Sequence, residues 1–251
     1  MILDKFSLSG KVAIVTGSDT GLGQGFSKAF VEAGAKVLGV SVVPSEATQE
    51  MLGADNFQFV VADLSSLDPI DMIINTAVEK FGRLDILVNN AGVIKREDTI
   101  DFSVENWDLV MNVNCRTLFF LSQAAAKQFM KQNSGGKIIS VASMLSYQGG
   151  IRVPSYTASK SAVKGITMTM ANEWAQHGIN VNAIAPGYMA TNNTAALRAD
   201  AERSEAIVDR IPAGRWGTPD DIMGAAVFLA SSARDYVNGF TLAVDGGWLG
   251  R

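Results

Sequence analysis

The chain has 251 residues, of which 47% are hydrophobic and 18% are charged, so it can bury a sizeable core and is not a disordered chain. Its formal net charge is −4, and no basic patch is interleaved with aromatic residues, which argues against nucleic acid and anionic membranes as partners. One cysteine (Cys115) and one histidine (His177) exclude an internal disulfide and a thiolate–imidazole zinc site, and we expect no metal.

The N-terminus has neither the basic start nor the long apolar core of a signal peptide, and no run approaches the ~18 apolar residues of a membrane span. We therefore expect a cytoplasmic protein. The lone His177 precedes Gly178 at a predicted helix end, where an imidazole suits a capping role. This placement argues against a Ser-His-Asp hydrolase.

Strand and helix patterns alternate along the chain, because short β-branched apolar runs predict strands and longer periodic runs predict helices. The order is strand 11–16, helix 21–33, strands 37–40 and 57–61, helix 67–81, strand 84–88, helix 103–131, strand 137–142, a helix that follows Pro154 and Ser155 and ends near 176, strand 179–184, helix 220–230 and strand 241–244. A polar insertion at 188–215 has helical character around 195–210 and is long enough to close as a lid.

Near-continuously apolar strands that alternate with helices imply a parallel sheet covered on both faces. No linker, repeat or low-complexity tract interrupts the pattern. We predict an α/β fold, with residues 1–251 forming one doubly wound (Rossmann) domain.

A glycine-rich stretch, 16–23 (TGSDTGLG), joins the first strand to the first helix. Glycines allow a tight turn there and let backbone N–H groups approach a pyrophosphate at the helix N-terminus. The stretch is not a G-x-G-x-x-G fingerprint, because Phe26 stands where the last glycine would be, and it lacks the Lys-Ser/Thr of a P-loop. Its position at the first strand–helix turn of a doubly wound sheet nevertheless favours nucleotide binding.

The end of the second strand usually discriminates between NAD and NADP, because an acidic residue there bonds the ribose 2′-hydroxyl and an arginine accommodates a 2′-phosphate. Here Ser41 or Val42 holds that place, so neither signal is present. Asp19 in the glycine-rich stretch would repel a 2′-phosphate, and no basic residue accompanies it. We therefore expect NAD as cofactor rather than NADP.

Three polar side chains are candidates for proton chemistry. Ser143 lies just past the end of a predicted strand, where α/β sheets place their ligands. Tyr156 and Lys160 are four residues apart in the following helix and therefore share one face. A phenol normally ionises near pH ~10, and a nearby ammonium lowers that value, so the pair could act as a general acid and base near neutrality.

With the glycine-rich stretch, the Asn89-Asn90-Ala91-Gly92 turn and Tyr156-x-x-x-Lys160 in this order, the chain resembles the short-chain dehydrogenase/reductase family over about residues 7–248. The resemblance implies that Tyr156 is the proton donor and acceptor, that Lys160 lowers its pKa and holds the nicotinamide ribose, that Ser143 bonds the substrate oxygen, and that Asn114 kinks its helix and holds a water in a relay to Lys160. It further implies that the dinucleotide is bound by Gly17, Asp19, Thr20, Gly21, Leu22, Gly23, Ser41, Asp63, Leu64, Asn90, Ala91, Gly92, Tyr156, Lys160, Pro186, Gly187, Met189 and Thr191.

Five variable segments (94–98, 146–155, 185–194, 211–217 and 244–248) are similar to the sugar-acid dehydrogenases of this family. Those enzymes interconvert keto and hydroxy forms of deoxy-hexonates with NAD(H) in the breakdown of uronate-containing polysaccharides. A carboxylate substrate with several hydroxyls calls for an arginine and neutral donors. The candidate substrate residues are Ser143, Arg96 or Arg152 as carboxylate partner, Gln148, Asn192 and Asn193.

Two alternatives remain open at this point. One is another activity within the family, such as a 3-oxoacyl-carrier-protein reductase or a different carbonyl reductase. The other is a nucleotide-binding scaffold without turnover, which the presence of Ser143, Tyr156 and Lys160 disfavours. The family resemblance also implies a homotetramer formed through the helices 103–131 and 155–176 and the C-terminal strand, and the apolar C-terminus 246–249 suits a subunit contact.

Overall fold

The computed structural model describes residues 1–251 and contains one parallel sheet of seven strands in the order β3-β2-β1-β4-β5-β6-β7. The strand order reverses between β1 and β4, and in such sheets ligands bind at the carboxyl ends of the strands beside this reversal. The strands are β1 (Val12–Thr16), β2 (Lys36–Ser41), β3 (Phe57–Val61), β4 (Ile86–Asn89), β5 (Gly136–Val141), β6 (Ile179–Pro186) and β7 (Thr241–Val244).

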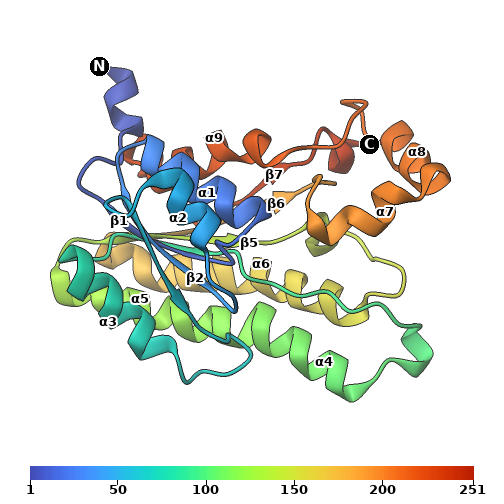
Figure 1. The fold of residues 1–251 in the computed structure, drawn as a ribbon, viewed down its shortest axis with the longest axis horizontal. Coiled ribbons are helices and arrows are strands. Elements are labelled where there is room, and N and C mark those ends of the chain that lie inside the picture. Colours follow the sequence, from blue (N-terminus) through green and yellow to red (C-terminus); the bar gives the residue numbers. More distant parts are fainter.

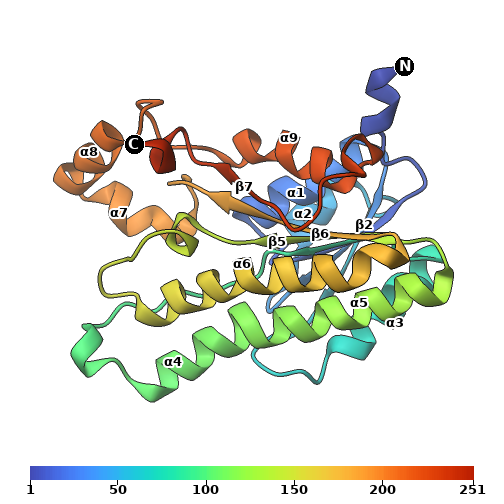
Figure 2. The same cartoon turned by 180° about the vertical axis from the view of Figure 1, so that it is seen from behind.

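Helices cover both faces of the sheet (Figures 1 and 2). The α1 and α9 helices pack on one face, where Phe26 and Phe30 join a buried cluster with Val15 of β1. The α3, α5 and α6 helices pack on the other, where Phe129 joins a cluster with Leu38 of β2. The helices are α1 (Gly21–Glu32), α2 (Glu46–Leu52), α3 (Ile70–Phe81), α4 (Val104–Met111), α5 (Leu118–Gln132), α6 (Pro154–Trp174), α7 (Ala195–Ala199), α8 (Ala201–Arg210) and α9 (Pro219–Ala230). None of them combines the length and apolarity that a membrane span requires.

The predicted fold class is confirmed, and every predicted strand is present with ends within two residues of the expectation. The α2 helix was not predicted; it has seven residues and buries only Thr48, so it carries no apolar period. The helix predicted over 103–131 is interrupted: α4 and α5 are joined by a π-helical turn, Asn112–Thr117. This turn contains Asn114, and π-turns inside helices frequently mark functional sites.

The insertion 188–215 contains the α7 and α8 helices, as its pattern indicated. We call this stretch the lid. It lies beyond the carboxyl ends of the strands, at the right of Figure 1, beside the C-terminus of the chain. A short helical turn, Asn192–Thr194, lies near the start of the lid, before α7.

Candidate active site

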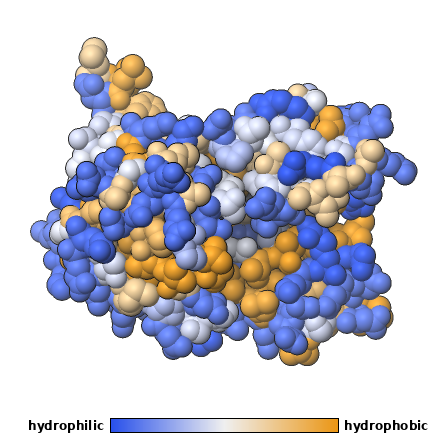
Figure 3. All heavy atoms as spheres, in the orientation of Figure 1, coloured by the Kyte–Doolittle hydropathy of each residue, from blue (hydrophilic) through white to orange (hydrophobic).

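A cleft of about 270 Å³ opens at the carboxyl ends of the strands and brings together segments that are far apart in the sequence. Figure 3 shows the molecular surface hollowed on this face, with apolar residues along the hollow. The lining combines the glycine-rich stretch, the Asn-Asn-Ala-Gly turn, the end of β5, the start of α6 and the first part of the lid. It includes Gly17, Asp19, Thr20, Gly21, Leu22, Asn90, Ala91, Gly92, Ser143, Tyr156, Lys160, Pro186, Gly187, Met189, Thr191, Asn192 and Asn193.

The glycine-rich stretch has no side chains at Gly17, Gly21 and Gly23, so its backbone N–H groups are accessible to a pyrophosphate. Gly17 and Gly21 have φ angles of +67° and +59°, which favour glycine. A Cβ on Gly23 would lie 1.8 Å from the carbonyl oxygen of Gly17, so the α1 helix can approach the loop this closely only with glycine at 23. The α1 helix begins at Gly21, and the unpaired N–H groups of its first turn suit an anion.

Thr16 joins the glycine-rich stretch to the turn after β4. Its hydroxyl accepts hydrogen bonds from the backbone N–H groups of Asn90 and Ala91, both at 2.9 Å. The side-chain amide of Asn90 in turn donates to the carbonyl of Thr16 at 2.8 Å. These bonds hold the two loops on either side of the strand-order reversal in one arrangement.

A second cleft, of about 260 Å³, continues from the first past the end of β2. Ser41 lies at this end but is buried, and its hydroxyl accepts from the N–H of Asp19 at 3.2 Å, so it supports the glycine-rich stretch. Val42 is 64% exposed beside it. The predicted residues Asp63 and Leu64 line the same cleft. The sequence reasoning missed its apolar walls, among them Val93 in the loop after β4 and the helical residues Leu109 and Val113.

Ser143, Tyr156 and Lys160 meet at the floor of the first cleft. Ser143 begins a short helical turn after β5, and its Oγ accepts from the N–H of Leu145 at 3.1 Å. Lys160 is 3% exposed, and its Nζ donates to the carbonyl of Val141 at 2.6 Å. The same Nζ lies 5.6 Å from the centre of the Tyr156 ring. The i, i+4 spacing in α6 therefore places phenol and ammonium together, as the sequence indicated.

Burial has the largest effect on the pKa values of Tyr156 and Lys160. Burial raises the pKa of Tyr156 above its usual value, and the hydrogen bond with Ser143 and the charge of Arg96 only partly oppose that rise. Burial also lowers the pKa of Lys160 to about 8, with a smaller opposing effect from Cys115. Arg96 thus adds a charge near the phenol that the sequence did not indicate, and the ammonium of Lys160 is hydrogen-bonded to the carbonyl of Val141.

Asn114 is fully buried and joins the π-helical turn to both sides of the cleft. Its Oδ1 accepts from the N–H of Val93 at 2.8 Å, and its Nδ2 donates to the carbonyl of Val93 at 2.9 Å and to Ser159 Oγ at 3.1 Å. Because Ser159 neighbours Lys160, Asn114 fixes the start of α6 relative to the turn after β4.

The structure separates the two arginines that were candidates for the carboxylate. Arg152 lies outside the cleft in an exposed ion pair with Asp98, with 2.8 Å between Nε and Oδ1. Arg96 does not line the cleft either, but it is close enough to Tyr156 for its charge to lower the pKa of the phenol. Gln148 also lies away from the cleft lining, because its Oε1 accepts a hydrogen bond from Trp248 at 3.3 Å. Of the predicted substrate residues, Ser143, Asn192 and Asn193 line the cleft.

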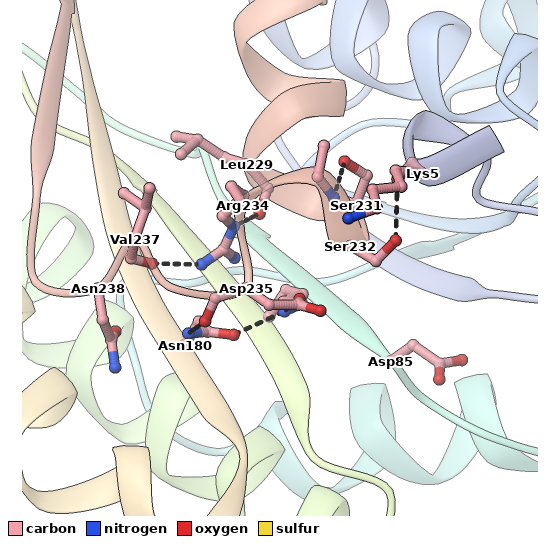
Figure 4. Close-up of polar contacts among 12 residues, drawn as sticks. Lys5, Asp85, Asn180, Leu229, Ser231, Ser232, Arg234, Asp235, Val237 and Asn238 are labelled. Carbon is pink, nitrogen blue, oxygen red and sulfur yellow. Dashed lines mark hydrogen bonds and ion pairs between the residues drawn. The ribbon is translucent and has the colours of Figure 1, made fainter. Parts of the chain in front are cut away.

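A larger cleft, of about 690 Å³, lies at the amino ends of the strands, opposite the glycine-rich stretch. Figure 4 shows polar side chains that line it, among them Asp85, Asn180 and Asp235. Its charged groups are paired with one another: Lys137 donates to both Asn180 and Asp235 at 2.6 Å. Beside it, the buried Arg234 donates to the carbonyls of Leu229 and Val237, and burial lowers the pKa of its guanidinium to about 10. These contacts have a structural role, since they bind the end of α9 to the segment before β7.

Comparisons with known proteins agree with this architecture. The family model described as enoyl-(acyl carrier protein) reductase matches residues 17–249. The chain is 62% identical to 2-dehydro-3-deoxy-D-gluconate 5-dehydrogenase of Dickeya dadantii, over the whole length of both chains. A crystal structure from Agrobacterium tumefaciens, provisionally named 2-deoxy-D-gluconate 3-dehydrogenase and holding bound NADP, is 52% identical, with a TM-score of 0.92 over 98% of this chain and 99% of that one.

A gluconate 5-dehydrogenase from Burkholderia cenocepacia, solved with NADP and tartrate, is 36% identical, with a TM-score of 0.93 over 100% of each chain. The sequence resemblance is thus confirmed by the family model, by full-length identity and by the fold. The chain belongs to the short-chain dehydrogenase/reductase family of oxidoreductases.

Proposed function

We propose that the protein transfers a hydride between a nicotinamide dinucleotide and a deoxy-hexonate, interconverting a hydroxyl and a keto group of 2-keto-3-deoxygluconate or a close relative. The observation that carries this proposal is the 62% identity, over the whole length of both chains, to a dehydrogenase named for that substrate. The cleft supports it, because Ser143 and Tyr156 stand together beside a loop suited to a pyrophosphate.

The residues around the cleft suit a dinucleotide. The glycine-rich stretch and the α1 N-terminus would hold the pyrophosphate, the cleft containing Asp63 and Leu64 would hold the adenosine, and Pro186, Gly187, Met189 and Thr191 would flank the nicotinamide. When bound, the nicotinamide supplies the hydride acceptor or donor. The protein itself has to position the substrate and control one proton.

The proton step falls to Tyr156 in this proposal. Alcohol oxidation requires that the hydroxyl proton leave the oxygen as the carbon becomes a carbonyl, and the Tyr156 phenolate would accept it. In the reverse direction the phenol would donate the proton to the oxygen that gains negative charge. Ser143 would donate a hydrogen bond to the same oxygen, and donors of this kind stabilise a developing oxyanion. Lys160 and Asn114 would hold the start of α6, and with it Tyr156, through their bonds to Val141 and Ser159.

The substrate carboxylate needs a cationic partner at the mouth of the cleft. We propose Arg96 for this role, because its charge acts on Tyr156 while Arg152 is engaged by Asp98. Asn192 and Asn193 would bond substrate hydroxyls from the lid side. The tartrate bound by the Burkholderia relative is likewise a small hydroxy acid.

The choice between NAD and NADP has support on both sides. Asp19 in the cleft and the neutral Ser41 and Val42 at the end of β2 favour NAD, because no cation stands ready for a 2′-phosphate. Two relatives of known structure hold NADP, so the NAD preference drawn from the sequence is not carried forward as a strict one. We propose that both dinucleotides bind.

The test is absorbance at the NADH and NADPH band with purified protein, 2-keto-3-deoxygluconate and either oxidised cofactor. Growth of the signal in the wild type and its loss in Tyr156→Phe would support the proposal. If the protein binds the reduced dinucleotide but turns over no hexonate, the sugar-acid assignment is wrong. Reduction of a 3-oxoacyl thioester would then be the next candidate, since the matching family model is described by an acyl-carrier-protein reductase.

We also propose that the chain assembles as a homotetramer through the long helices α5 and α6. Their outer surfaces expose large apolar side chains, among them Phe120 (37%), Met130 (38%) and Met168 (45%). Light scattering after size-exclusion chromatography tests this; a monomer at micromolar concentration would contradict it.

A further inference from the structure

We propose that Trp248, near the C-terminus, is a positioning residue that fixes the lid (188–215) against the loop 143–148, and thereby sets the geometry of the substrate end of the cleft. We call the loop 143–148 the serine loop, because it begins with Ser143. The proposal rests on the proposed function for its kinetic consequence, and on contacts of the chain alone for its structural consequence.

Trp248 is buried against the lid from within its own chain. It is 4% exposed and forms a cluster with Met144 of the serine loop and with Ile207 and Ile211 of the lid. The Trp248 side chain is therefore engaged within its own chain, whereas Leu249 beside it is only partly buried. A side chain that packs on both loops at once holds them at a fixed separation.

Polar and aromatic contacts orient the indole ring. The ring centre of Trp248 lies 4.9 Å from that of Tyr188, edge to face, and the guanidinium of Arg210 lies 4.0 Å from the Trp248 ring centre. The indole N–H donates to Gln148 Oε1 at 3.3 Å. Trp248 therefore contacts the beginning and the end of the lid and hydrogen-bonds to the last residue of the serine loop.

The backbone before Trp248 is shaped for this approach. Gly246 and Gly247 have φ angles of +66° and +92°, where other residues are strained. A Cβ on Gly247 would lie 3.0 Å from Pro212, so the segment touches the end of the lid directly. Asp245 closes the turn, since its carboxylate accepts from the N–H groups of Gly247 and Leu249, both at 2.9 Å.

Arg251 adds a last contact between the C-terminus and the lid. Its Nη1 donates to the carbonyl of Asp209 at 3.2 Å, in the last turn of α8, where a cation is favourable. The lid thus begins at the cleft, with Asn192 and Asn193, and ends on the C-terminal segment. Without Trp248 the lid and the serine loop would move independently. Ser143 on one side of the substrate and Asn192 and Asn193 on the other would then no longer be held at a fixed separation.

A double-mutant cycle tests whether Trp248 acts through Gln148. Trp248→Phe keeps an aromatic ring but removes the indole N–H together with part of the packing surface, and Gln148→Leu removes the acceptor. We expect Gln148→Leu to raise the KM for the hexonate about fivefold and Trp248→Phe at least as much, with the double variant no worse than Trp248→Phe, because both changes delete the same hydrogen bond. NADH affinity should stay unchanged. Additive losses, or a loss of NADH affinity, would overturn the proposal.

Trp216→Phe is the matched control, because Trp216 directly follows the lid and its indole donates to Ser204 of the lid, at 3.1 Å, and not to the serine loop. The change in KM caused by Trp216→Phe should add to the change caused by Gln148→Leu, because the two residues do not share a hydrogen bond. Hydrogen exchange of the full-length protein separates this proposal from the proposed function, since it needs no substrate. Trp248→Phe should speed exchange in 143–148, and Trp248→Ala in 195–210 as well, with the β4 and β5 strands unchanged. Unaltered exchange in both segments would overturn the proposal even if the enzyme oxidises the hexonate.

Discussion

The Nζ of Lys160 lies 5.6 Å from the ring centre of Tyr156 and donates its hydrogen bond elsewhere, to the carbonyl of Val141. The lysine is therefore a buried cation whose chief partner is neutral, and burying such a charge is unfavourable. This explains why burial lowers the pKa of Lys160 to about 8. Keeping the Lys160 ammonium buried for the reaction therefore lowers the free energy of unfolding of the protein.

Lys160→Met should raise the free energy of unfolding at pH 7 while abolishing turnover. An unfolded lysine has a pKa of ~10.4, so between about 8 and that value the unfolded chain binds the proton and the folded chain does not. Stability of the wild type therefore rises with pH across this window, and the full penalty is present below it. We expect a gain of roughly 1–2 kcal/mol at pH 7, because the unpaired Val141 carbonyl offsets part of the relief.

Urea unfolding followed by tryptophan fluorescence at pH 7 and at pH 10.5, at one protein concentration, measures this effect. The gain should disappear at the higher pH, where the folded lysine is neutral. Lys127→Met, on the exposed surface of α5, is the control and should show no pH-dependent difference. An equal gain at both pH values would contradict the assignment of a buried charge.

Arg96→Ala should move the pH dependence of alcohol oxidation. The Arg96 charge lowers the pKa of Tyr156, against the larger effect of burial, which raises it. Without that charge the phenolate forms at higher pH, so the rise of kcat/KM with pH should shift upward. Arg152→Ala is the matched control, because Arg152 is ion-paired with Asp98 on the surface. A shift in the Arg152 variant and none in the Arg96 variant would reverse the assignment.

Asn114→Ala should cost both stability and activity. The buried amide provides both hydrogen bonds to the backbone of Val93, and its removal leaves two polar groups without partners. We expect a loss of about 2–4 kcal/mol in the free energy of unfolding. Urea denaturation measures it, with Asn112→Ala in the same π-helical turn as control. A loss below that of the control would show that the Val93 contacts contribute little.

The strands, the long helices and the proximity of Tyr156 to Lys160 could all be predicted from the sequence, because each depends on local periodicity. A parallel strand buried on both faces reads as an unbroken apolar run, and residues four apart on a helix must share a face. The α2 helix was not predicted, because its seven residues bury only one side chain and so show no helical period of apolar residues.

The directions of loop side chains could not be predicted in this way. Arg96 and Arg152 were equivalent candidates in the sequence, and only the fold brings Asp98 beside Arg152. The position of the Trp248 side chain depends on contacts with residues far away in the sequence, such as Gln148 and Met144. The pKa of Tyr156 also depended on its burial, which outweighs the nearby charges and which spacing alone does not reveal.

Gly23→Ala should abolish dinucleotide binding, whereas Gly21→Ala should be milder. A Cβ at 23 would lie 1.8 Å from the Gly17 carbonyl oxygen, so the glycine-rich stretch must open. A Cβ at 21 meets only Thr191, at 3.6 Å, and the remaining cost is backbone strain at φ +59°, about 1 kcal/mol. Titration with NADH, followed by its fluorescence, compares the two. Equal affinities in both variants would contradict the close approach of α1 to the loop.

Val42→Arg and Val42→Asp should move the cofactor preference in opposite directions. Val42 lies at the end of β2, lines the cleft with Asp63 and is 64% exposed, so either charge can be carried without disturbing the core. Arginine at this position would pair with a 2′-phosphate and should raise the NADP-to-NAD ratio of kcat/KM about tenfold. Aspartate would repel that phosphate and bond the ribose hydroxyls, and should lower the ratio. Glu79→Arg, on the exposed surface of α3, controls for net charge. If the two Val42 variants left the ratio unchanged, the 2′ position of the ribose would lie elsewhere, and the cleft beside β2 would lose its assignment to adenosine.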